Sequence, residues 1–70
     1  MTRELVLQQA EKLSFPCQIN EQNCWQILPI KEEETWKLTE IESKWILSLR
    51  NVPQLRLSSE EAIAFLKSRA

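Results

Sequence analysis

Large apolar and basic side chains alternate along residues 35–57 of this chain. Within each expected strand the tryptophans and leucines share one parity, and they are Trp36, Leu38, Trp45, Leu47, Leu49, Leu55 and Leu57. The basic positions have the opposite parity, and they are Lys37, Lys44, Arg50 and Arg56. A period of two residues is typical of strands that bury one face. The pattern therefore predicts a small antiparallel sheet with an apolar face turned inward and a basic face turned outward.

The pattern is strongest for a hairpin of residues 35–41 and 44–50. With Glu42 and Ser43 as a two-residue turn, the expected cross-strand pairs are Glu40 with Trp45, Leu38 with Leu47, Trp36 with Leu49, Ile41 with Lys44, Thr39 with Ile46 and Lys37 with Ser48. A shift of one residue would place apolar side chains opposite basic ones. Because Glu-Ser is not a favoured pair for a tight turn, a longer loop between the two strands is the alternative.

Helices are expected at both ends of the chain. Thr2 is a candidate cap for the first helix, whose apolar stripe is Leu5, Val6, Ala10 and Leu13. Ser58 and Glu61 fit a capping box for the second helix, whose apolar stripe is Ala62, Ile63, Phe65 and Leu66.

Further strands are expected at residues 24–30 and 54–57. Pro29 should lie at a sheet edge or end its strand, because proline has no amide hydrogen to donate. Residues 1–70 are therefore expected to form a single small α+β domain of order α-β-β-β-β-α. It should be a two-layer sandwich, with both helices on one face of an antiparallel meander sheet.

The 70-residue chain contains no glycine. Turn positions that need a positive φ must use other residues, of which asparagine is the most tolerant, so Asn20, Asn23 and Asn51 are expected in turns. The turn before residues 54–57 is expected at residues 51–53. Without glycine-rich phosphate-binding loops, no nucleotide cofactor is expected.

The residue types for catalysis and metal binding are sparse. The chain has no histidine, and its two cysteines, Cys17 and Cys24, are too few for a zinc site made of thiolates alone. Both are expected to be free thiols in the cytoplasm, although their spacing would also permit a disulfide across a hairpin. Glu40 is expected at the rim of the inward face. The chain has no long apolar segment, so we expect no membrane span. Because it has no histidine and no base beside its cysteines in the sequence, we expect no enzyme.

The outward face is the candidate functional surface, and its expected partner-binding residues are Lys37, Thr39, Ile41, Lys44, Ile46, Ser48, Arg50 and Arg56. Leu28 and Ile30 join them if the register of residues 24–30 holds. An apolar strip rimmed by charge is typical of association surfaces. The expected function is a non-catalytic protein-protein interaction module or accessory subunit, with a homodimer as one form. Clustered cations also fit the alternative, a weak nucleic-acid-binding protein.

The predicted order of helices and strands is similar to that of two known families, but this chain lacks residues that they use. The predicted order resembles the topology of the double-stranded-RNA-binding domain and of small HicA-type toxin ribonucleases. The RNA-binding domains have a glycine and lysine cluster at the start of their last helix, where this chain has the acidic stretch Ser58-Ser59-Glu60-Glu61. The toxins use a catalytic histidine, which this chain lacks. The resemblance therefore implies a fold class and neither activity.

Overall fold

The computed structural model describes residues 2–70, without the side chain of Thr2. Within this range the chain forms helices α1 (Thr2–Lys12) and α2 (Ser59–Arg69) and a five-stranded antiparallel sheet. The strands are β1 (Cys17–Ile19), β2 (Trp25–Ile27), β3 (Trp36–Ile41), β4 (Lys44–Leu49) and β5 (Val52–Leu57), and they lie side by side in chain order. The predicted α+β class, a meander sheet between two terminal helices, is confirmed, with one strand more than expected.

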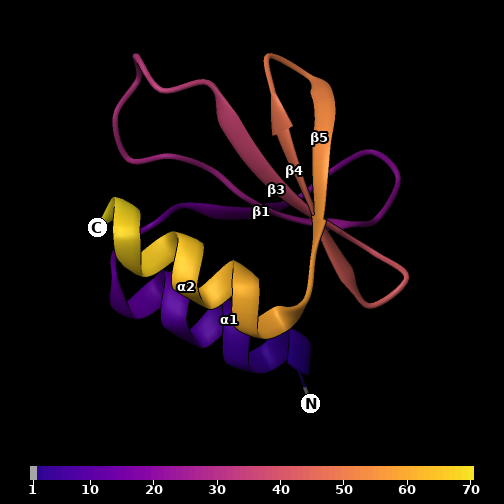
Figure 1. Cartoon of the computed structure of the whole chain (residues 1–70), viewed down its shortest axis with the longest axis horizontal. Helices are drawn as coiled ribbons and strands as arrows, with labels where there is room; N and C mark the ends of the chain where they lie inside the picture. Colours follow the sequence, from indigo (N-terminus) through magenta and orange to yellow (C-terminus); the bar gives the residue numbers. More distant parts are fainter. Residues whose placement is uncertain (1) are drawn as a thin grey trace.

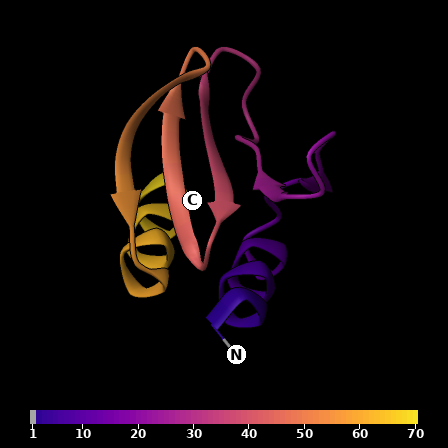
Figure 2. The ribbon, with the colours of Figure 1, turned by 90° about the vertical axis from the view of Figure 1, so that its right-hand side faces the viewer.

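Helices α1 and α2 pack against each other on one side of the sheet (Figure 1). Helix α2 contacts β4 and β5, and α1 contacts β1. In the view turned by 90°, β4 and β5 lie in front of α2, and β3 lies beside β4 (Figure 2). The molecule therefore has two layers, and we call the sheet face turned away from the helices the open face.

The core lies between the helices and the inward face of the sheet. Trp36 is 3% exposed and Trp45 is 1% exposed. Phe15 and Phe65 both meet the Trp36 ring edge-on, with ring centroids 5.6 and 5.0 Å away. Aromatic pairs prefer this geometry, and each buried ring removes on the order of 200 Å² from water. The other buried residues are Val6, Ala10, Ile27, Leu38, Leu47, Ala62 and Leu66. The predicted inward orientation of Trp36 and Trp45 is confirmed.

The hairpin of β3 and β4 has the predicted register at all six pairs, from Trp36 with Leu49 to Ile41 with Lys44. Its turn consists of Glu42 and Ser43, with φ values of 49° and 66°. Positive φ at both central residues matches the right-handed twist of the strands, as in a type I′ turn. The two-residue turn is therefore confirmed, although neither residue is a preferred one for that backbone conformation.

The next turn differs from the prediction. It consists of Arg50 and Asn51, with φ values of 51° and 68°, and β5 already begins at Val52. Leu47 pairs with Leu55 while Ser48 pairs with Pro53, so Gln54 is the extra residue of a β-bulge. Proline is tolerated here because β5 is an edge strand.

Three leucines expected in the core are exposed. Leu49 is 46% exposed and Leu55 is 57% exposed, although both have the parity of the inward face. The hairpin of β4 and β5 extends past the helices, so the Leu49 end of β4 lacks a helix to cover it (Figure 1). Leu5 of α1 is also exposed, whereas Leu7 packs against the core. The apolar stripe predicted for the first helix is therefore wrong at Leu5.

The first two strands are short. Strand β1 was not predicted, and β2 ends at Ile27 instead of reaching residue 30. Pro29 follows two residues later, as expected for a residue that cannot donate to a strand ladder. The side chain of Asn20 closes the turn between these strands, because its Oδ1 accepts from the N–H groups of Gln22 and Cys24 at 2.9 Å each.

The cap of α2 is the predicted one. The Ser58 side chain accepts a hydrogen bond from the Glu61 N–H at 3.1 Å, and Glu61 Oε1 accepts one from the Ser58 N–H at 2.9 Å. The cap predicted for α1 is Thr2, whose side chain lies outside the part of the chain that the structure describes. Neither helix of residues 2–70 is long and apolar enough to cross a membrane.

Candidate functional site

The open face is built from rows of side chains that run across the strands. One row crosses the whole sheet and contains Gln18, Gln26, Thr39, Ile46 and Arg56. On one side of it Ile41 pairs with Lys44, and on the other Lys37, Ser48 and Pro53 are neighbours. Because these residues share one face of a regular ladder, their relative positions are set by the strand register.

Seven of the eight predicted site residues therefore meet on the open face: Lys37, Thr39, Ile41, Lys44, Ile46, Ser48 and Arg56. The eighth, Arg50, lies in the turn before β5, where strand parity does not apply. Leu28 and Ile30 follow the end of β2, so they do not extend the strip along that strand.

Hydrogen bonds tie together the polar part of this face. Gln18 Nε2 donates to Gln26 Oε1 at 3.0 Å, and Gln26 Nε2 donates to Thr39 Oγ1 at 3.1 Å. Lys37 Nζ donates to the Oδ1 of Asn51 at 3.2 Å. Side chains that already bond to one another lose little further freedom on binding, so this half of the face is preorganised.

The other part of the open face is apolar and cationic. Ile41 is 45% exposed, Ile46 is half-buried, and the register makes them diagonal neighbours. Lys44 lies opposite Ile41, and Arg56 lies opposite Ile46. Among residues 2–70 neither cation has an ion-pair or hydrogen-bond partner. Ile41, Lys44, Ile46 and Arg56 thus form a group in which two isoleucines alternate with two available positive charges.

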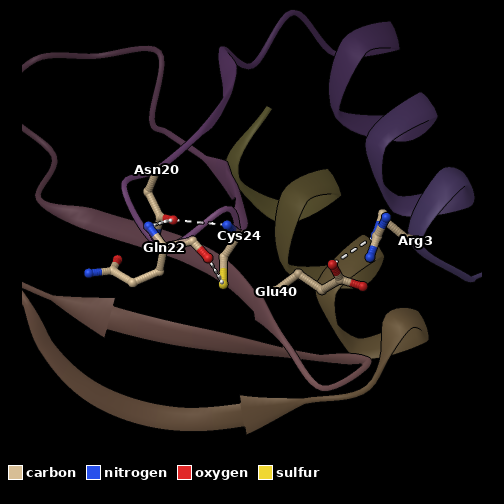
Figure 3. A network of polar contacts seen from close by, with 5 residues as sticks. All are labelled: Arg3, Asn20, Gln22, Cys24 and Glu40. Carbon is tan, nitrogen blue, oxygen red and sulfur yellow. Dashed lines mark hydrogen bonds and ion pairs between the residues drawn. The ribbon is translucent and has the colours of Figure 1, made fainter.

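Glu40 lies on the inward side of β3, at its rim. Its Oε1 accepts a hydrogen bond from Arg3 Nε of α1 at 2.7 Å, while its side chain is 11% exposed (Figure 3). The two charges link the start of α1 to the sheet. Glu40 therefore has a structural partner at the rim position that the sequence predicted.

The cysteines are free thiols. Cys24 lies at the turn that Asn20 closes, and its Sγ donates to the Gln22 carbonyl oxygen at 3.8 Å (Figure 3). Partial burial of the sulfur, and after it the negative charge of Glu11, raises the pKa of the Cys17 thiol, although the residue as a whole is exposed. Residues 2–70 contain no cluster of three or more acidic or cysteine side chains that could hold a metal ion.

One exposed surface was missed because two of its residues, Leu49 and Leu55, were expected in the core and the third, Val52, was expected in a turn. Leu49, Val52 and Leu55 are all strongly exposed at the free end of the β4–β5 hairpin, on the helix side of the sheet. The parity of a residue predicts which face of the sheet it lies on. It does not predict how much of that face the helices cover, so parity alone does not reveal this surface.

No family model, curated protein or solved structure matches this chain. What the protein binds is therefore inferred from its surfaces.

Proposed function

We propose that this protein is a small non-catalytic protein-interaction module, or an accessory subunit, that binds its partner with the open face of its sheet. The observation that carries this proposal is the apolar pair of Ile41 and Ile46, which lies beside the free cations Lys44 and Arg56. The hydrogen-bonded row from Gln18 to Thr39 extends the same flat surface. Association surfaces combine such an apolar centre with a polar rim.

The charge of this face indicates the chemistry of the partner. On the described strands its ionisable residues are Lys37, Lys44 and Arg56, all of them cations. A partner segment with apolar residues and neighbouring carboxylates is complementary to it, because opposite potentials steer association and set the register. The free thiols of Cys17 and Cys24 support a cytoplasmic location for this interaction.

The partner is either another protein or a second copy of this chain. A dimer formed by two open faces would be isologous, so it must keep the cations of the two copies apart. Light scattering behind a sizing column separates the alternatives: a dimer mass that Ile46→Glu reduces to a monomer mass identifies self-association.

The test for another partner compares proteins captured from the native host by three forms of the chain. The wild type and Val52→Glu should retain the same partner, because Val52 is exposed on the other side of the sheet. Ile46→Glu should lose it, since a carboxylate replaces the apolar centre. The proposal is contradicted if Ile46→Glu captures the same proteins as the wild type and the wild type is a monomer.

A second candidate function, weak nucleic-acid binding, is favoured by the same three cations. A few lysines and arginines on one face can neutralise phosphates, with an affinity that falls steeply as salt rises. Trp36 and Trp45 lie in the core and are not available on this face to stack on bases. A gel-shift titration at low and moderate salt tests this function. Retardation at low salt that Lys44→Glu weakens supports it, and no retardation at low salt excludes it.

A further inference from the structure

A groove of about 370 Å³ lies on the helix side of the sheet, between α1 and the hairpin of β1 and β2. Its apolar lining consists of Leu7, Phe15 and Trp25. The thiol of Cys17 also borders it. This groove is separate from the open face, which turns away from the helices.

The floor of the groove is both rigid and accessible. Phe15 is 4% exposed and packs edge-on against Trp36, so it holds the floor in place. Trp25 is half-buried, in contrast to Trp36 and Trp45. An apolar side chain entering the groove would therefore meet an indole that is still partly in contact with water, and covering that surface favours binding.

One wall of the groove is acidic. Glu4, Gln8 and Glu11 all line it from α1, at the i, i+4 and i+7 spacing that places side chains on one face of a helix. Glu11 also contributes to the raised pKa of Cys17, which lies on the opposite wall. Its negative charge therefore acts across the groove.

The opposite wall is the edge strand of the sheet. The Leu28 N–H donates to the Pro16 carbonyl oxygen, and the Asn20 N–H donates to the Cys24 carbonyl oxygen, each at 2.9 Å. Hydrogen-bonded pairs alternate along an antiparallel ladder, so the intervening residues Cys17 and Ile19 point their N–H and C=O groups away from β2. Ile19 is also 53% exposed. The edge of β1 thus presents backbone groups beside the groove.

From these features we infer that the groove and the edge of β1 together bind an extended, basic segment of a second protein partner. The main chain of the segment pairs with Cys17 and Ile19, as in strand addition at a sheet edge. An apolar side chain enters the groove against Trp25. The lysine or arginine side chains two residues before and after it share its face of the strand and lie near Glu4 and Glu11. Charge complementarity selects a basic segment, since the groove wall contributed by α1 carries two carboxylates.

Nuclear magnetic resonance of the isotope-labelled full chain tests this inference with defined peptide probes. The first probe is the acetylated, amidated pentapeptide Lys-Thr-Val-Thr-Lys, whose valine and lysines share one face of a strand, and the second has glutamate in place of each lysine. The lysine peptide should shift the amide signals of Cys17 and Ile19 and the indole signal of Trp25. The glutamate peptide should leave them unchanged.

Two comparisons separate charge from strand pairing. Glu11→Gln should weaken binding of the lysine peptide about two- to fivefold, the range expected for one exposed charge pair. The matched variant Glu33→Gln, in the exposed loop before β3, should leave the affinity unchanged. A lysine peptide that is N-methylated at the valine and at both lysines should lose the shifts at Cys17 and Ile19, because the residues that face the groove then cannot donate to the edge strand.

Three results would overturn the inference. The first is equal shifts with the lysine and glutamate peptides, and the second is an affinity that Glu11→Gln does not change. The third is the absence of shifts at Cys17, Ile19 and Trp25 at millimolar lysine peptide, including the case in which the signals of Thr39 and Ile46 move instead.

Discussion

Leu38 and Leu55 have the same side chain and lie on the same face of the sheet, yet Leu38 is fully buried and Leu55 is 57% exposed. The difference follows from their positions. Leu38 lies on the central strand β3, under the helices, whereas Leu55 lies on the edge strand β5. The stability that each leucine contributes should therefore differ strongly.

We expect Leu38→Ala to lower the free energy of unfolding by about 2–5 kcal/mol, because it removes a buried side chain and leaves a cavity. The matched change Leu55→Ala should alter it by less than about 0.5 kcal/mol, as for most surface substitutions. Urea denaturation followed by tryptophan fluorescence measures both. If Leu38→Ala does not fold, Leu38→Met should still fold with a loss below about 1.5 kcal/mol. Equal losses for the two alanine variants would contradict the assignment of Leu55 to the surface.

The Cys17 thiol provides a second test at single-residue scale. Its pKa is raised by burial and then by Glu11, so the folded chain holds this proton at a pH where the unfolded chain has lost it. The free energy of unfolding should therefore fall as pH rises above the ordinary thiol value of 9.0.

The pH profile of alkylation by iodoacetamide, in a Cys24→Ser background, reports this shift directly. Its midpoint should be higher in the folded chain than in urea, and Glu11→Gln should lower the folded midpoint. Glu33→Gln is the matched control and should not change it. Identical midpoints in the folded and unfolded chain would contradict the proposed environment of Cys17.

At the scale of elements, the turns of this glycine-free chain adopt positive φ values, which are unusual for residues other than glycine. Positive φ occurs at Glu42 and Ser43, and again at Arg50 and Asn51. Non-glycine residues adopt this region at a cost, and asparagine adopts it more readily than most. The strands on either side of each turn must therefore hold it in this conformation.

Replacing Glu42 with asparagine and Ser43 with glycine should stabilise the chain by about 0.5–2 kcal/mol, because Asn-Gly is the preferred pair for a two-residue hairpin turn. The matched double change Glu32→Asn with Glu33→Gly should not stabilise it, since neither position has a positive φ. The urea midpoint of unfolding measures both. A lower midpoint for the first variant would contradict the turn conformation of Glu42 and Ser43.

The elements that were predictable are those with a signal in the local sequence. The register of β3 with β4 follows from parity, and the cap of α2 follows from the spacing of Ser58 and Glu61. Strand β1 has only three residues, Cys17–Ile19, and this is too short for an alternating pattern to indicate a strand. The bulge at Gln54 was also missed, because an extra residue in one strand has no local sequence signal here.

At the scale of the whole molecule, the two proposed surfaces lie on opposite sides of the sheet and differ in charge. The open face carries Lys44 and Arg56, whereas the groove beside α1 is lined by Glu4 and Glu11. The net charge of −1 conceals this separation. The open-face residues of β3 and β4, together with Arg56, could be predicted from parity. The groove could not, because it forms where α1 meets β1 and β2, which are strands of only three residues each.

The central claim is that the open face is the surface at which this protein meets a partner. Photo-crosslinking in the native host tests it most directly, with p-benzoylphenylalanine introduced at Ile46 or at the exposed Ala64 of α2. We expect a covalent adduct of higher mass from position 46 and none from position 64. Adducts from position 64 with none from position 46 would contradict the claim.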